Sequence, residues 1–126
     1  MPLEFKQVYA VVKLIPKGMV MSYVGVARQC GYPRSARHVG HALFALTGDA
    51  ADKVPWWRVV NAQGRISNSS TPDAPQRQRK RLEKEGVVVS DGLRVDMRLF
   101  DAEMLVFARM SAKQTRQAER TKKPRK

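Results

Sequence analysis

The stretch "MSYVGVARQCGYPRSARHVGHAL", residues 21–43, decides the fold because it sets two short helices on either side of a tight turn. Ser22 is a residue type that caps helix N-termini, and the spacing after it predicts a first helix over Val24–Cys30. Gly31 and Pro33 follow this helix. Glycine commonly closes a helix and proline cannot continue one. The first half of the stretch therefore predicts a helix with a defined start and a defined end.

The second half of the stretch predicts another helix, for which Ser35 is a candidate cap. Apolar residues follow at the spacing of a core-facing stripe, at Val39, Leu43 and Leu46. Basic residues occupy the expected opposite face, at Arg37, His38 and His41. Two short helices around a Gly/Pro turn, the second with basic and small residues, make a helix-turn-helix candidate.

The segments on either side of this unit predict one more helix and one hairpin. Residues 3–15 place apolar side chains at intervals of three and four, which is the pattern of an amphipathic helix. Residues 58–67 predict two short strands around a turn at Asn61–Gly64, because both end residues tolerate positive φ.

The region after this hairpin predicts a helix and a second hairpin. The helix is expected over Pro75–Glu85 with Gly86 as its cap. Residues 87–97 predict a hairpin with its turn at Asp91-Gly92. The fold class that results is α+β and mainly helical, a winged helix-turn-helix with small β-hairpins.

The charge of the chain indicates a polyanionic partner. Its 126 residues carry 24 Lys and Arg against 11 Asp and Glu, a formal net charge of +13. A small domain with this imbalance repels itself, so nucleic acid is the leading partner class and an anionic membrane surface is the second. No apolar run approaches the ~20 residues that span a bilayer, so we expect no membrane segment.

The charge and the apolar periodicity predict one domain over residues 1–110 and a basic, disordered tail over 111–126. A short helix is expected at the end of the domain, over 101–110. The tail carries seven Lys and Arg residues against one Glu, and it is either a solvated tail without selective function or a DNA tether.

The small number of cysteines and histidines leads us to expect no metal site and no cofactor. Cys30 is the one cysteine and the chain has two histidines, so neither a disulfide nor a multi-cysteine zinc site can form. The N-terminal segment lacks a secretory signal pattern. We therefore expect an intracellular, DNA-associated protein without a cofactor, in which Cys30 is a buried filler rather than a nucleophile.

Several blocks in order and spacing resemble the DNA-binding domain of the O6-alkylguanine-DNA alkyltransferases. They are "IPKGMVMSYVGVARQCGYPRSARHVGHAL", "VPWWRVVNAQGRIS" and "RLEKEGV", and together they cover about residues 5–88. The active site of that family has the form Pro-Cys-His-Arg-Val, where this chain has Pro55-Trp56-Trp57-Arg58-Val59. Tryptophan in the cysteine position is the mark of the alkyltransferase-like proteins, which are non-enzymatic relatives.

The residues at these positions agree with an absence of catalysis. Alkyl transfer from guanine O6 needs a thiolate and a group that activates it. Trp56 offers no suitable lone pair, and the indole N–H of Trp57 only donates. The relatives usually keep histidine where this chain has Trp57, so this departure breaks the hydrogen-bond relay that the resemblance would otherwise imply.

The resemblance implies how DNA would be contacted. The O6 edge of guanine is hidden in the duplex, so inspection requires base flipping. The family pattern Ala-Arg-X-Val-Gly lies here at Ala36–Gly40, which makes Arg37 the finger that enters the stack from the minor groove. Small residues allow this helix to approach the groove closely. The DNA-contacting residues implied are Tyr23, Ser35, Ala36, Arg37 and Gly40.

The resemblance also implies a pocket for the flipped base and a structural support beneath it. The pocket residues are Tyr23, Trp56, Val59 (through its backbone), Ser69 and Ser70. The supporting residues are Pro55, Trp57, Arg58, Asn61 and Glu85. Arg58 is expected to be an internal tie, and Glu85 matches the glutamate that orients the family's histidine. With Trp57 in place of that histidine, Glu85 is expected to cap a helix end or to pair locally.

The implied function is recognition of O6-alkylguanine in duplex DNA, without catalysis, as a flag for nucleotide excision repair proteins, by a monomer. Two alternatives stay open. A sequence-specific winged-helix transcription regulator would read base edges in the major groove with Asn, Gln and Arg, residue types that are scarce in residues 35–43. A residual alkyltransferase or a glycosylase would need a nucleophile or a carboxylate in residues 54–60, which contain neither.

Overall fold

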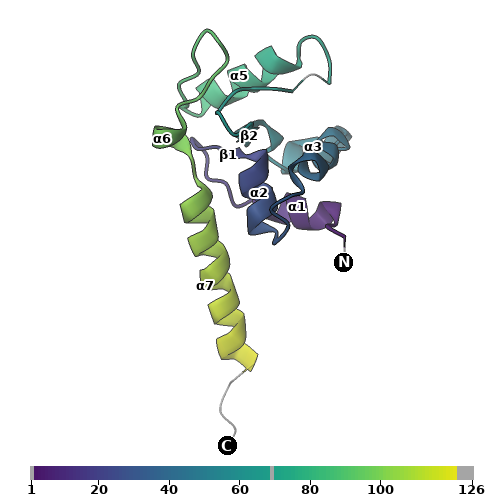
Figure 1. Cartoon of the computed structure of the whole chain (residues 1–126), viewed down its shortest axis with the longest axis vertical. Helices are drawn as coiled ribbons and strands as arrows, with labels where there is room; N and C mark the ends of the chain where they lie inside the picture. The colour runs from purple at the N-terminus through teal and green to yellow at the C-terminus, as the bar shows by residue number, and fades with distance from the viewer. Residues whose placement is uncertain (1, 69, 122–126) are drawn as a thin grey trace, which may run out of the picture.

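The computed structural model describes residues 2–68 and 70–121 and is mainly helical (Figure 1). In chain order the elements are α1 (Phe5–Val12), β1 (Met21–Ser22), α2 (Tyr23–Gln29), α3 (Ala36–Phe44), α4 (Gly48–Lys53), the 3₁₀ turn η1 (Trp56–Arg58), β2 (Val59–Val60), α5 (Ala74–Lys84), α6 (Met97–Phe100) and α7 (Glu103–Thr121). The predicted α+β class, with helices dominant, is confirmed.

The helix-turn-helix forms as α2 and α3, with the expected signals at the start and the end of α2. The Ser22 hydroxyl accepts a hydrogen bond from the Gly25 N–H at 2.9 Å. At the other end Gly31 has φ +87°, and the Tyr32 N–H donates to the Ala27 carbonyl at 2.9 Å. This bond joins residues five positions apart. It is the characteristic bond of the Schellman motif, which the positive φ of the glycine permits. The turn therefore brings α3 against α2.

α3 begins where the sequence predicts but differs in two details. Ser35 occupies the N-cap position, yet its side chain makes no capping hydrogen bond. His38, expected on the outer face, instead packs against Phe5 of α1, with ring centroids 5.2 Å apart. α1 contacts α3 on this side, so His38 is half-buried beside Phe5 rather than on an open face.

The predicted hairpin at 58–67 forms only in part. The turn closes, because the Gly64 N–H donates to the Asn61 carbonyl at 2.9 Å. However, β2 pairs in parallel with β1, with Met21 opposite Val59. Both of these side chains are fully buried. Burial against the helical core therefore determines the partner of β2, and the chain after the turn makes only an isolated antiparallel bridge, from Arg65 to Arg94.

The second hairpin forms with a different turn residue in the left-handed region. Val89 and Val95 make an antiparallel bridge, and the Ser90 N–H donates to the Arg94 carbonyl at 2.9 Å. Leu93, not Gly92, has positive φ, at +61°. The turn is therefore one residue longer than the Asp-Gly pattern predicts.

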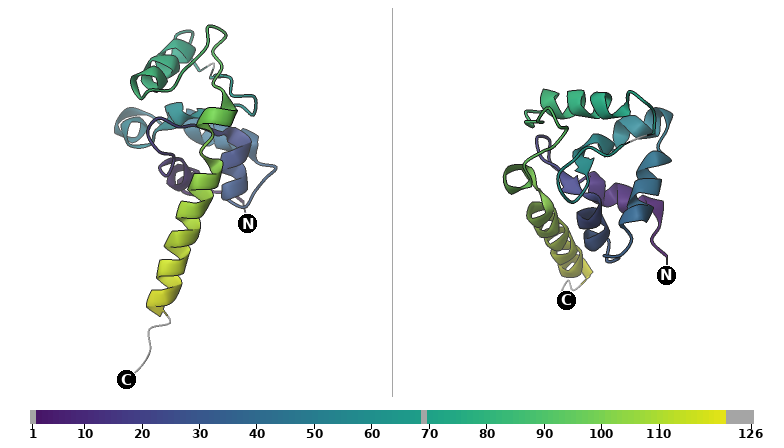
Figure 2. Two further views of the ribbon diagram at one scale, coloured as in Figure 1. Left: turned by 90° about the vertical axis from the view of Figure 1, so that its left-hand side faces the viewer. Right: turned by 45° about the horizontal axis from the view of Figure 1, so that its top comes forward.

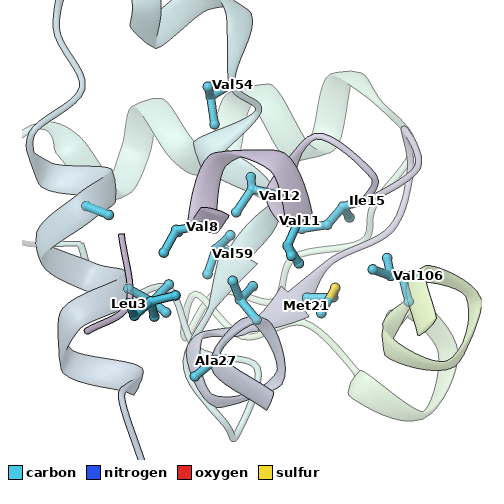
Figure 3. Packing of buried hydrophobic residues seen from close by; sticks show 14 residues of the cluster. Leu3, Val8, Val11, Val12, Ile15, Met21, Ala27, Val54, Val59 and Val106 are labelled. Atoms are coloured by element: carbon cyan, nitrogen blue, oxygen red, sulfur yellow. The ribbon is translucent and has the colours of Figure 1, made fainter. Parts of the chain in front are cut away.

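Two clusters of buried side chains hold the elements together. The larger cluster joins α1, α2, α3 and the first turns of α7. Figure 3 shows Val8, Val12 and Val59 close together, with Val106 on the side of Met21. The smaller cluster lies under α5 and includes Val60, Leu82 and Val95. β2 connects the two clusters, since Val59 belongs to the first and Val60 to the second.

The end of the chain differs from the sequence prediction. The short helix expected over 101–110 continues as α7 to Thr121, so residues 111–121 are helical rather than a disordered tail. No glycine or proline interrupts residues 103–121, and most of them are good helix formers. Residues 122–126 lie outside the described residues. Figures 1 and 2 show the later turns of α7 projecting beyond the body.

α7 is attached to α2 through polar contacts near its start. The Glu103 carboxylate accepts two hydrogen bonds from Arg28, at 2.7 and 2.9 Å, and one from Gln29 at 2.8 Å. Further along, Arg109 donates to the Leu14 carbonyl at 3.1 Å. Within residues 2–68 and 70–121, no helix is long and apolar enough to cross a membrane.

Candidate functional site

A cavity of about 680 Å³ opens beside the helix-turn-helix. Its walls come from the start of α2, from α3 and α4, from η1, from the loop between β2 and α5, and from α5. The lining residues are Tyr23, Val24, Ala36, Arg37, Gly40, Leu43, Phe44, Leu46, Ala51, Trp56, Asn61, Ala62, Ser67, Asn68, Ser70 and Arg77. Seven of the residues predicted for the site therefore lie around one cavity.

α3 supplies a wall made of small residues and one long cation. Ala36, Arg37 and Gly40 line the cavity, whereas Ser35 is not among its lining residues. Arg37 is exposed, and no carboxylate among the described residues forms an ion pair with it. A Cβ added at Gly40 would meet no protein atom within 4 Å, so packing inside the chain does not require glycine there. This wall is open to a large ligand.

The first residue of α2 places a phenol in the cavity. Burial raises the pKa of Tyr23 above its ordinary value, and a side-chain hydrogen bond with Ser67 opposes this shift. The hydroxyl is therefore neutral near pH 7 and can donate or accept. Ser67 and Asn68 were missed by the sequence reasoning, which named Ser69 and Ser70 in the same loop. Ser70 lines the cavity, and Ser69 lies outside the described residues.

η1 turns the two tryptophans in different directions. Trp56 lines the cavity, and the Trp57 ring stands nearly perpendicular to it, at 87° with centroids 5.9 Å apart. Pro55, just before them, is buried. Val59 was expected to line the pocket through its backbone; its side chain lies in the core, and Val59 is not among the residues that line the cavity. Its carbonyl is occupied by Gln78 Nε2 at 2.8 Å.

Beneath the cavity, the Glu85 carboxylate accepts hydrogen bonds from both Arg58 and Trp57. Arg58 binds it in a bidentate manner, with Nε to Oε1 at 2.9 Å and Nη2 to Oε2 at 2.7 Å. The Trp57 indole N–H donates to Oε2 at 3.0 Å. Arg58 also donates to the Ile15 carbonyl at 2.8 Å. Glu85 therefore does not cap a helix end alone but joins η1 to α5, and Arg58 ties this pair to the end of the α1 region.

Electrostatics keep the Glu85 carboxylate ionised. Burial pushes the pKa of Glu85 upward, but the hydrogen bonds from Arg58 and Trp57, together with the charge of Arg58, lower the pKa below its ordinary value. The side chains of Arg58 and Glu85 are only 14% and 9% exposed. A pair this well buried and this well hydrogen-bonded is costly to break.

α5 covers the other side of the tryptophans with residues that the sequence did not single out. The Arg81 guanidinium lies 4.5 Å from the Trp57 ring centroid and 5.8 Å from that of Trp56. Gln78, which is buried, donates to the Trp57 carbonyl at 3.0 Å. The 3.6-residue period of the helix brings Gln78 and Arg81 to the same side, but no linear motif marks them.

The cavity offers hydrogen-bonding groups and an aromatic surface, and its lining contains no cysteine, histidine or carboxylate. Cys30 lies elsewhere, at the end of α2, where burial raises the pKa of its thiol to about 11. Near pH 7 such a thiol is almost entirely protonated and is a poor nucleophile. Across the described residues, no three His, Cys, Asp or Glu side chains form a group that could hold a metal ion.

Comparison with known proteins identifies the family. The family model described as "6-O-methylguanine DNA methyltransferase, DNA binding domain" matches residues 4–87. The chain belongs to this family. These residues include every wall of the cavity and the Arg58–Glu85 support. α6 and α7 lie after the matched region.

Within this family, the chain is similar to alkyltransferase-like and base-flipping members. A DNA base-flipping protein of Vibrio parahaemolyticus is 43% identical, over 75% of this chain and 90% of that protein. Alkyltransferase-like protein 1 of Schizosaccharomyces pombe is 42% identical, over 68% of this chain and 77% of that protein. A crystal structure of the S. pombe alkyltransferase-like protein, with damaged DNA containing O6-carboxymethylguanine, matches with a TM-score of 0.71 at 36% identity. That match covers 77% of this chain and 92% of the S. pombe chain.

Proposed function

We propose that this protein recognises O6-alkylguanine in duplex DNA without catalysis. It enters the minor groove with α3, flips the damaged base and holds it in the cavity. The observation that carries the proposal is the position of Trp56. Its indole lines a cavity beside Arg37, at the motif position where the family has its alkyl-accepting cysteine.

The cavity has the size and the chemistry for an extruded purine. Its volume of about 680 Å³ falls within the range of roughly 300–1,000 Å³ that is usual for small-ligand sites. The Trp56 ring offers a surface on which a base can stack. Tyr23, Ser67 and Asn68 offer donors and acceptors for the polar edges of the base. The exposed Arg37 is available to fill the space that the base leaves in the duplex.

The same arrangement supports binding without alkyl transfer. The indole of Trp56 cannot accept an alkyl group as a thiolate does, and Trp57 already donates its one N–H to Glu85. A base in this cavity is therefore held rather than repaired. The proposal includes what happens after binding, namely that the bound lesion is passed to nucleotide excision repair proteins. It also includes that the protein acts as a monomer.

Intrinsic fluorescence provides a direct test, because Trp56 and Trp57 are the only tryptophans in the chain. Two duplexes that are identical except for guanine or O6-methylguanine are titrated, and the protein mass and the integrity of the DNA are measured afterwards. We expect tighter binding and stronger quenching with the lesion, unchanged protein mass and intact DNA. Equal affinity for both duplexes would refute lesion recognition. A mass gain of one methyl group, or an abasic site, would instead show an enzyme.

A further inference from the structure

α5 presents a row of cations on its exposed side, next to the cavity. Arg77, Lys80, Arg81 and Lys84 are all exposed and line a groove together with Glu83. Positions separated by three, four and seven residues lie on one face of a helix. Figure 1 shows α5 at one end of the molecule, with this helix uncovered by any other helix on its outer side.

The acidic residues near this row are already engaged, which leaves the lysines uncompensated. Glu83 pairs with Arg79 at 3.1 Å, on a neighbouring part of the helix. Arg81 lies over the tryptophan rings and 3.9 Å from Asp52. Among the described residues, neither Lys80 nor Lys84 forms an ion pair. Within the row, Lys80 and Lys84 therefore carry positive charge that no described carboxylate compensates.

Arg77 connects this row to the lesion cavity, because it lines both the cavity and the groove on α5. Its guanidinium pairs with Asp73 at 3.2 Å, but the two side chains are 53% and 69% exposed, so the pair is weak in water. Arg77 therefore lies between the cavity and the part of α5 that carries Lys80 and Lys84.

We propose that Arg77, Lys80 and Lys84 bind successive phosphates of the DNA strand beside the cavity. Seven residues of helix rise about 10 Å, and one strand of B-DNA presents a phosphate about every 3.4 Å along the axis. The row is therefore long enough for about three phosphates. These contacts hold the duplex against α3 and carry no information about the base. The placement of the strand rests on the proposed function.

The test compares two double variants that remove the same charge from different helices. Lys80→Gln with Lys84→Gln removes the row, and Lys6→Gln with Lys13→Gln removes two exposed lysines from the α1 region. Binding of each protein to the guanine and O6-methylguanine duplexes is measured from about 50 to about 200 mM salt. Thermal unfolding is measured in parallel, and both variants should match the wild type because all four side chains are exposed.

If the lysines of α5 bind phosphates, the slope of log affinity against log salt becomes less negative by about 1.8, at about 0.9 for each lost contact. The control variant keeps the wild-type slope, and the preference for the lesion is unchanged in both. A slope for the α5 variant equal to that of the control would overturn the proposal. Loss of the lesion preference in the α5 variant would also overturn it, since phosphate contacts do not read the base.

Failure of the proposed function would be seen in a different measurement, namely equal affinity of the wild type for both duplexes. If the α5 double variant unfolds at a lower temperature, Lys84→Gln alone replaces it, with an expected slope change of about 0.9. A single variant with the wild-type slope would then overturn the proposal.

Discussion

Removal of the Glu85 carboxylate tests how the support beneath the cavity is held together. In Glu85→Ala the Arg58 guanidinium, whose side chain is 14% exposed, loses its counter-ion. The Trp57 N–H also loses its acceptor. Breaking a buried pair by removing one partner typically costs about 3–5 kcal/mol. For a domain of this size the midpoint of thermal unfolding is then expected to fall by about 10–20 °C.

Denaturant unfolding monitored by tryptophan fluorescence and circular dichroism measures this cost, and Glu83→Ala is the matched control. Glu83 is two residues away on the same helix, but its partner Arg79 is 25% exposed and its own side chain is 45% exposed. Exposed pairs contribute about 0–1 kcal/mol. The reasoning would be refuted by a Glu85→Ala protein whose free energy of unfolding lies within about 1 kcal/mol of the wild type.

The pH dependence gives the same prediction a second measurement. The folded-state pKa of Glu85 lies below its unfolded value, so the carboxylate stabilises the protein fully above the unfolded value, about 4.3. This stabilisation is lost as the pH falls through the folded pKa. The difference in unfolding free energy between the wild type and Glu85→Ala should be constant from neutral pH down to about 5 and should shrink below about 4. A difference that stays constant into acid would contradict a charged Glu85.

Further predictions concern DNA binding and reactivity. Arg37→Ala should weaken binding to the O6-methylguanine duplex at least tenfold by fluorescence titration, and unchanged affinity would remove its assignment as the finger. Trp56→Cys should remain unalkylated by the lesion because no base activates the thiol, whereas the further change Trp57→His should permit a methyl gain detectable by mass. Cys30 should react with iodoacetamide at a rate that rises with pH toward a midpoint near 11, and a midpoint near 8 would contradict its burial. Deletion from Ser111 should make the salt slope less negative and leave the lesion preference intact.

The helix-turn-helix could be predicted from sequence because its signals are local. Ser22 and Gly31 act within four or five residues of themselves, through one cap bond and one positive φ. The parallel pairing of β1 with β2 could not be predicted in this way. Each strand has two residues and they lie 38 positions apart, so neither shows a period that identifies the other. Their pairing follows from burial of the whole core.

Many residues of the candidate site could be predicted from the linear motif. The others depend on α5, which packs against η1. Arg37 and Trp56 stand in recognisable patterns and lie in one cavity. Arg81 and Gln78 act on η1 only because α5 folds back over it. The length of α7 was missed for a different reason, since apolar periodicity identifies a helix face that packs against a core, and the later turns of α7 project beyond the body.

Tryptophan at position 57 supports the site structurally but cannot activate a nucleophile. A neutral histidine has one nitrogen that donates and one that accepts, so it can bind a carboxylate and also take a proton from a nucleophile. An indole has only the donor, and here that donor is 3.0 Å from Glu85. Trp57 therefore makes a bond that fixes η1 to α5 and has no acceptor with which to activate a neighbour. Its neighbour Trp56 carries no thiol to activate. The Arg81 guanidinium lies 4.5 Å from the Trp57 ring centroid, a packing contact that a smaller imidazole would reach less fully.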